Sequence, residues 1–145
     1  MPKPPANPDY AALVRDSFAR QTMMQTLGAS LETIEPGFCR IQSSIPPGAL
    51  QQHGVGHAGL TFSIGDSAAG YAALSVMPEG SEVVTSEIKI NLMAPARGDH
   101  LIAEGRVLRG GKRLITVQAD VWAVASGART HIAVLLGTMV PVPKR

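Results

Sequence analysis

The stretch from Ala58 to Leu74, AGLTFSIGDSAAGYAAL, is apolar on nearly every side when it is wound into a helix. A helix of this kind is normally buried inside a protein. Gly65 and Gly70 lie within it, although each glycine destabilises a helix by roughly 1 kcal/mol relative to alanine. We therefore expect another backbone to pass very close to these glycines, and the sequence predicts a thin central helix that lies tightly in a sheet.

Strand-like segments follow the central helix. Alternating apolar residues predict four strands, over about residues 82–93, 100–108, 114–124 and 131–140. The short connections between these late strands predict that they form an antiparallel meander. A buried helix followed by such strands indicates an α+β fold.

The chain begins with a proline-rich segment. Residues 2–8, PKPPANP, contain four prolines and are expected to form an extended, poorly ordered arm. A chain of 145 residues has the size of one ordinary domain. We therefore expect a flexible arm over residues 1–8 and a single domain over residues 9–145.

Two further elements are expected between the arm and the central helix. Asp9 has the residue type of an N-cap, and the apolar spacing from Tyr10 to about Thr26 predicts one amphipathic helix after it. Strand-like segments on both sides of Pro36-Gly37 predict a β-hairpin with its turn at these two residues.

Composition excludes several classes of protein. No apolar run reaches the ~18 residues that span a bilayer, and the N-terminus has no apolar core of signal-peptide length. Cys39 is the only cysteine, which rules out an intramolecular disulfide framework and a cysteine-cluster zinc site and favours a reducing cytoplasm. A formal net charge of +2 is too small for a nucleic-acid-binding surface, so we expect neither nucleic acid nor a membrane as partner. A small phosphorylated ligand suits the basic cluster of Arg106, Arg109, Lys112 and Arg113 better.

The surrounding sequence argues against three familiar motifs. Residues 54–59 match the pattern GxGxxG, but the residues before them form a poor strand and the later strands are not parallel to it. His53 and His57 are four residues apart, yet glycines interrupt any helix between them and no third ligand has a usual spacing. Ser63 lies in a helical turn and not in a nucleophile elbow. The sequence thus predicts no dinucleotide site, no metal site and no serine nucleophile.

Asp66 is the most informative polar residue of the central helix. Aspartate is a poor helix former, and a buried carboxylate needs a partner or a function. No basic residue lies within one turn of Asp66. We therefore expect a raised pKa and a role as general base or nucleophile; the alternative is a carboxylate that is hydrogen-bonded to a neighbouring subunit.

The start of the same helix is a second candidate site. Its free N–H groups and its dipole can polarise a carbonyl oxygen, and Gly56, Ala58 and Gly59 allow close approach. His57 and Asp66 are nine residues apart, which is roughly 13 Å along a helix. If both ends act on one carbonyl, the site must combine the helix start of one subunit with Asp66 of another, so the sequence argues for an obligate dimer.

Three segments together resemble a known family. The run from His57 to Ala73, HAGLTFSIGDSAAGYAA, is similar to the HGG…D helix of the PaaI-like, phenylacetate-pathway type of hotdog thioesterases. The run TSEIKINLMAPARGD, from Thr85 to Asp99, looks like that family's next strand, and RVLRGGKR, from Arg106 to Arg113, looks like its next hairpin. The resemblance covers about residues 48–140 in the right order. It implies a curved antiparallel sheet wrapped around the central helix, and dimers, usually paired into homotetramers, with a site at each dimer interface.

The resemblance also implies roles for the residues of both candidate sites. Asp66 falls on the family's catalytic carboxylate. Ala58 falls on the middle position of HGG, between His57 and Gly59, and its backbone N–H would polarise the thioester oxygen while His57 supports the loop. The Ala58 side chain departs from the family's glycine but leaves the N–H in place.

Further positions follow from the same resemblance. Gln51 falls where many members have an Asn or Gln that places the attacking water or the thioester, and Thr85 matches a Ser/Thr near the catalytic carboxylate. Arg109, Lys112 and Arg113 are implied contacts for the phosphates of coenzyme A, which is part of the substrate and not a separate cofactor; a solvated hairpin tip is the alternative for these three.

The resemblance implies an acyl-CoA thioesterase that releases a free acid and coenzyme A. A hotdog dehydratase would need a histidine on the central helix, where position 71 is Tyr, and a DNA-binding sensor would need a further module. A non-catalytic acyl-CoA binder remains the alternative. Candidate lining residues for an acyl pocket, with core packing as their alternative role, are Met23, Met24, Phe62 and Leu74.

Overall fold

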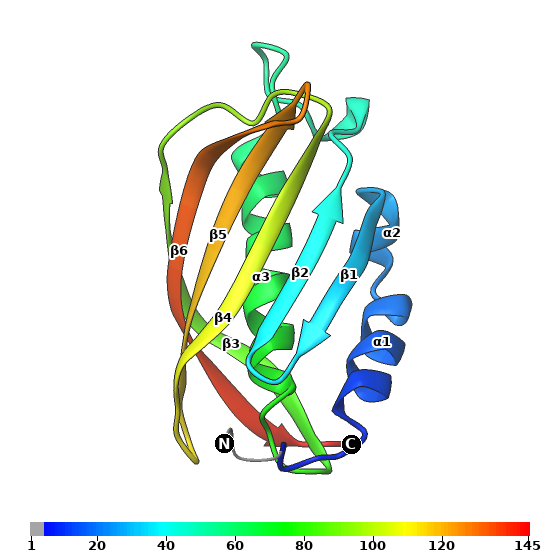
Figure 1. Ribbon diagram of the computed structural model, residues 1–145, viewed down its shortest axis with the longest axis vertical. Coiled ribbons are helices and arrows are strands. Elements are labelled where there is room, and N and C mark those ends of the chain that lie inside the picture. The colour runs from blue at the N-terminus through cyan, green and yellow to red at the C-terminus, as the bar shows by residue number, and fades with distance from the viewer. Residues whose placement is uncertain (1–4) are drawn as a thin grey trace.

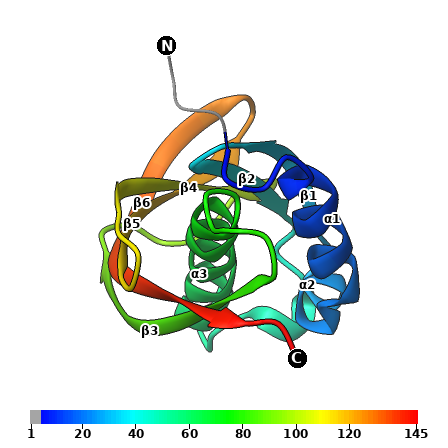
Figure 2. The ribbon, with the colours of Figure 1, turned by 90° about the horizontal axis from the view of Figure 1, so that it is seen from below.

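The computed structural model describes residues 5–145. Helix α3, Ala58–Leu74, has the predicted bounds and lies at the centre of the molecule. A six-stranded antiparallel sheet curves around it (Figure 1 and Figure 2). The strands are β1 (Ala29–Glu35), β2 (Phe38–Ser43), β3 (Ser81–Leu92), β4 (His100–Gly110), β5 (Ile115–Ala125) and β6 (Ala128–Pro143). The predicted sheet wrapped around a buried helix is thus confirmed.

The strand order corrects one prediction. Strands β4, β5 and β6 form the expected meander, but the sheet order is β1-β2-β4-β5-β6-β3, so β3 pairs with β6 and not with its sequence neighbour β4. The connection over residues 93–99 is too long for a tight hairpin and is pinned near the start of α3, where Ala96 forms a bridge to Gly56. This crossover brings β3 to the far side of α3.

The close approach of helix and sheet occurs at an unexpected glycine. A Cβ atom built on Gly105 of β4 would lie 2.3 Å from the carbonyl carbon and oxygen of Ala68 and 2.5 Å from the nitrogen of Ala69. The prediction of a nearby backbone at Gly65 and Gly70 was wrong. The atoms nearest to a Cβ built on Gly65 belong to the Leu135 and Val121 side chains, and a Cβ on Gly70 would have nothing nearer than the Met139 methyl group, at 4.0 Å. The sheet therefore supplies the glycine that lets α3 lie against it.

The N-terminal helix is broken at Gln21. The structure has α1 (Tyr10–Arg20) and α2 (Thr22–Thr26) in place of one helix, and Gln21 between them has extended backbone angles. Both helices lie beside β1, at one edge of the sheet (Figure 2). The predicted hairpin at Pro36-Gly37 is confirmed, since β1 pairs with β2 across it.

The segment before α1 differs from the predicted arm. Residues 5–8 form a bend and a turn, and Asn7 is buried, with its side chain accepting a hydrogen bond from the Asp9 N–H at 2.9 Å. Asp9 occupies the N-cap position but makes no side-chain capping bond. The extended arm therefore does not reach residue 8, and the remainder of it, residues 1–4, lies outside the described residues.

The two edges of the sheet are different. At the β1 edge the sheet is flanked by α1 and α2, whereas β3 forms the other edge and pairs only with β6 along residues 5–145. Four apolar side chains on or beside this edge are about half exposed, namely Val84, Leu92, Met93 and Leu136. Among the described helices, none is both long and apolar enough to cross a membrane.

Candidate active site

The start of α3 leaves one backbone donor unused. His57 is the N-cap, and its Nδ1 accepts a hydrogen bond from the Gly59 N–H at 2.7 Å. This bond occupies the Gly59 N–H and fixes Nδ1 as an acceptor. The Ala58 N–H makes no hydrogen bond within residues 5–145. At the positive end of the helix dipole, the Ala58 N–H is therefore available to an oxygen atom of a ligand.

Gln51 lies beside this helix start. Its side-chain oxygen accepts a hydrogen bond from the His53 N–H, and its amide nitrogen, which makes no hydrogen bond within residues 5–145, can donate to a ligand. Gln51, His57 and Ala58 line one cavity of about 380 Å³, and its other wall is formed by Leu92 and the segment over residues 94–96. The structure thus brings together three of the predicted site residues at the N-terminal end of α3.

Asp66 lies in the middle of α3 and faces β3. The Thr85 hydroxyl donates a hydrogen bond to Asp66 Oδ1 at 2.8 Å, and Oδ2 accepts no hydrogen bond from the described part of the chain. The predicted proximity of Thr85 to the carboxylate is confirmed as a contact. Burial raises the pKa of Asp66, and the hydrogen bond from Thr85 lowers it in part, so the expected direction of the pKa is also confirmed.

The two groups of residues lie in separate cavities. Asp66 and Thr85 line a cavity of about 180 Å³ that shares no residue with the one at Ala58. Asp66 follows Ala58 by eight residue steps along the helix, or roughly 12 Å of axial rise. Within one copy of the chain, the free N–H and the carboxylate cannot act on the same carbonyl group.

Most of the cavity wall around Asp66 was not predicted from the sequence. Ser17 and Gln21 from the α1–α2 region, and Ser67 and Tyr71 from α3, line it together with Val83. The cavity at Asp66 is not lined by any of the candidate apolar residues Met23, Met24, Phe62 and Leu74. Met24 is buried in the core. Ser67 and Tyr71 are four residues apart and therefore share a face of α3, but this spacing does not place them on the face of Asp66, and nothing in the sequence marked the break at Gln21.

The basic residues at the end of β4 and in the β4–β5 turn lie elsewhere. Arg109, Lys112 and Arg113 are exposed, and none of them forms a salt bridge within residues 5–145. Lys112 lines a largely apolar cavity of about 570 Å³ beside Met77, after the C-terminal end of α3. None of the three residues lines the cavity at Asp66 or the one at Ala58 of the same chain.

Other nucleophiles are unsuited to catalysis. Ser63 donates its hydroxyl to the Gly59 carbonyl oxygen at 2.6 Å, which is the local bond expected for a serine in a helix. Burial raises the pKa of the Cys39 thiol to about 12, so the thiolate is not formed near neutral pH. Between residues 5 and 145, no group of three or more His, Cys, Asp or Glu side chains is placed to hold a metal ion.

Comparison with known proteins decides the family. Residues 53–127, more than half of the chain, match the thioesterase superfamily. The chain belongs to this superfamily. The matched segment contains α3 with Asp66 and the whole of β3 and β4, and membership is consistent with a hydrolase.

Solved structures similar to this thioesterase superfamily protein have the same architecture. It is similar to a solved thioesterase family protein from Silicibacter pomeroyi, with 39% identity, a TM-score of 0.90, and coverage of 92% of this chain and 98% of the other. The E. coli PaaI protein, from the phenylacetic acid degradation operon, shares the fold at 22% identity, with a TM-score of 0.83 over 94% of this chain and 95% of its own. A protein of Halobacterium salinarum that is provisionally named an esterase is 31% identical over 90% of this chain and 91% of its own length. The hotdog fold expected from the sequence is thereby confirmed.

Proposed function

We propose that the protein is an acyl-CoA thioesterase whose single domain, residues 9–145, hydrolyses a coenzyme A thioester to a free acid and coenzyme A. One observation carries this proposal: the half-buried Asp66 carboxylate has one oxygen held by Thr85 and the other without a partner in the described chain. Burial raises the pKa of Asp66, which strengthens it as a base.

The chemistry needs two groups besides water. The Ala58 N–H donates to the carbonyl oxygen of the thioester and stabilises the negative charge that develops there. Asp66 takes a proton from water as the water oxygen bonds to the carbonyl carbon. The carbon–sulfur bond then breaks, and the proton passes to the departing thiolate of coenzyme A. Direct attack by Asp66, followed by hydrolysis of the resulting anhydride, gives the same products.

A second copy of the chain completes the site in this proposal. Strand β3 pairs with β6 on one side, and its other edge has no partner strand among residues 5–145 and carries exposed apolar residues, which favours pairing with another edge. Thr85 contacts Asp66, and Leu92 lines the cavity at Ala58. An antiparallel pairing that sets Thr85 of one copy opposite Leu92 of the other brings Asp66 to the partner's Ala58 end. The same arrangement supports a homodimer, and we propose that two such dimers form a homotetramer.

The exposed basic residues at the end of β4 and in the β4–β5 turn are proposed to bind phosphate groups of the substrate. Arg109, Lys112 and Arg113 carry positive charges with no carboxylate partner among residues 5–145, and guanidinium and ammonium groups bind phosphates well. We assign to them the phosphates of coenzyme A.

Thiol release from a panel of short, long and aromatic acyl-CoAs tests the function. Turnover of at least one thioester, followed with a chromogenic thiol reagent, is the expected result. Stoichiometric binding of the same thioesters without any thiol release, measured by calorimetry, would identify a binding protein and overturn the proposal.

Replacing Ala58 by proline removes the proposed carbonyl-polarising donor alone. Proline is tolerated at the first position of a helix, and His57 already has the extended angles, φ −63° and ψ 147°, that a residue before proline adopts. We expect kcat to fall by about 10²- to 10³-fold with an unchanged melting temperature. Ala58→Gly keeps the N–H and is the matched control, expected to retain activity. Equal activity of the two variants would show that the Ala58 N–H takes no part.

The pH profile tests the contact between Thr85 and Asp66. The hydrogen bond from Thr85 favours the ionised carboxylate, so Thr85→Val is expected to raise the pKa of Asp66 further. A carboxylate base is active only when it is ionised, and activity is lost as the pH falls through its pKa. The acid limb of kcat/KM should therefore move to higher pH in this variant. Thr33→Val, on β1, is the control and should leave the limb in place.

A further inference from the structure

The cavity beside Asp66 has a polar wall built from two parts of the chain. Ser17 lies on α1 and Gln21 at the break before α2, whereas Ser67 and Tyr71 lie on α3. Tyr71 is only 4% exposed, and its ring packs against Phe18 with the centroids 6.0 Å apart. The hydroxyl group of Tyr71 is therefore held at a fixed place in the wall.

A chain of hydrogen bonds runs along this wall. The Ser67 hydroxyl donates to Gln21 Oε1 at 3.0 Å, Gln21 Nε2 donates to the Tyr71 hydroxyl oxygen at 3.1 Å, and the Tyr71 and Ser17 hydroxyls are 3.2 Å apart. The bonds fix the amide of Gln21 with its oxygen toward Ser67 and its nitrogen toward Tyr71.

Two hydrogen-bond donors of this network of side chains are left unused. Tyr71 and Ser17 carry one hydroxyl hydrogen each, and the bond between them uses only one of the two. Gln21 Nε2 carries a second hydrogen that makes no bond within residues 5–145. The wall therefore offers one O–H and one N–H to whatever occupies the cavity, and it presents no carboxylate apart from Asp66 itself.

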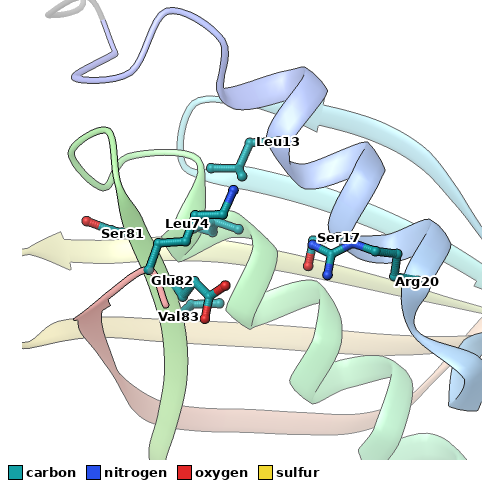
Figure 3. A pocket seen from close by; sticks show the side chains of 8 residues that line it. Leu13, Ser17, Arg20, Leu74, Ser81, Glu82 and Val83 are labelled. Carbon is teal, nitrogen blue, oxygen red and sulfur yellow. The ribbon is translucent and has the colours of Figure 1, made fainter.

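The position of the wall suits the acyl part of a substrate. Tyr71 follows Asp66 by five residues, or about 7.5 Å along the helix, which is within reach of an acyl group whose thioester carbonyl lies at Asp66. An adjoining cavity of about 180 Å³ shares Ser17 and Val83 and lies between α1 and β3 (Figure 3). The groove therefore continues beyond the polar wall toward Leu74.

We propose that Tyr71, Gln21 and Ser17 select acyl groups that carry a hydrogen-bond acceptor, a hydroxyl or oxo group, a few carbons from the thioester. This inference rests on the proposed thioesterase function and names its substrate class. An unsubstituted acyl chain leaves both donors of the wall without a partner after it displaces water, and buried donors left in this way disfavour the complex.

Matched pairs of thioesters test the proposal. We compare butanoyl-CoA with 3-hydroxybutanoyl-CoA, and hexanoyl-CoA with 5-hydroxyhexanoyl-CoA, by kcat/KM. The parent protein is expected to prefer the better-fitting hydroxylated member by about tenfold or more. Tyr71→Phe and Gln21→Leu should bring this ratio close to one, because kcat/KM falls for the hydroxylated substrate. The kcat/KM of the unsubstituted substrate should change less than about threefold. Tyr10→Phe and Gln25→Leu are the matched controls outside the cavity and should keep the parent ratio.

Each other outcome has a distinct meaning. A parent ratio near one, or a ratio that survives in both variants, overturns the proposed selection while the thioesterase function stands. Equal losses on both members of a pair assign Tyr71 and Gln21 a structural role and also overturn it. If no thioester is hydrolysed, the proposed function fails, and the same ratios are then taken from dissociation constants measured by calorimetry, where a ratio near one in the parent overturns the selection.

Discussion

Asp66→Asn is expected to lower kcat/KM for the best acyl-CoA by about 10²- to 10⁴-fold, the usual contribution of a positioned general base. Asparagine has the same shape and can still accept the hydrogen bond from Thr85 at its side-chain oxygen. It has no proton-accepting carboxylate, so neither the general-base route nor direct attack is open to it. Since burial disfavours the charged carboxylate, the neutral amide should not lower the melting temperature.

Two further measurements sharpen this experiment. Asp9→Asn, at an exposed position with no side-chain capping bond, is the control and should keep full activity. Mixing the inactive Asp66→Asn and Ala58→Pro chains after unfolding should restore about a quarter of the parent activity, because half of the random dimers are mixed and each has one intact site. No restoration would contradict a site that is shared between two copies.

Gly105→Ala is expected to destabilise the fold by about 3 kcal/mol or more, at the upper end of the effects of overpacking. The added methyl group would lie 2.3 Å from backbone atoms of Ala68. Neither the helix nor the strand can give way by a change of side-chain conformation. Thermal unfolding should show a loss of about 6–12 °C.

The control for this variant is another glycine-to-alanine change. Gly48 has no heavy atom within 4 Å of a built Cβ and does not have a positive φ, so Gly48→Ala should leave the melting temperature nearly unchanged. An equally small effect of Gly105→Ala would mean that α3 can move away from the sheet, and that its close seating is not required for stability.

The apolar patterns within single segments predicted most helices and strands of the fold. They did not predict which strands pair across the sheet. The bounds of α3 followed from its apolar run and from the polar loop before it. The place of β3 did not follow, because closure of the sheet around α3 decides its partner, and alternation within a strand carries no such information. The same reason explains why Gly65 and Gly70 drew attention while Gly105, which makes the backbone contact, did not.

The residues of the candidate site were also predicted only in part. The residue type and position of Asp66 marked it in the sequence, and the contact with Thr85 came from a resemblance that covers both residues. The wall that contains Ser17 and Gln21 was not foreseen, because it depends on the break between α1 and α2 and on the packing of α1 near α3. No proline or glycine signals that break.

Two residues of the polar wall and the residues proposed for catalysis come from different parts of the chain. Ser17 and Gln21 come from the first 27 residues, whereas Asp66, Thr85 and the free N–H of Ala58 all come from later segments. In the proposed enzyme, part of the acyl preference is therefore open to change, in evolution or by design, through a short leading stretch that takes no part in bond breaking, while Tyr71 of α3 supplies the rest. Grafting that stretch from a relative onto this scaffold is a direct way to alter the acyl preference while Asp66, Thr85 and the Ala58 N–H stay in place.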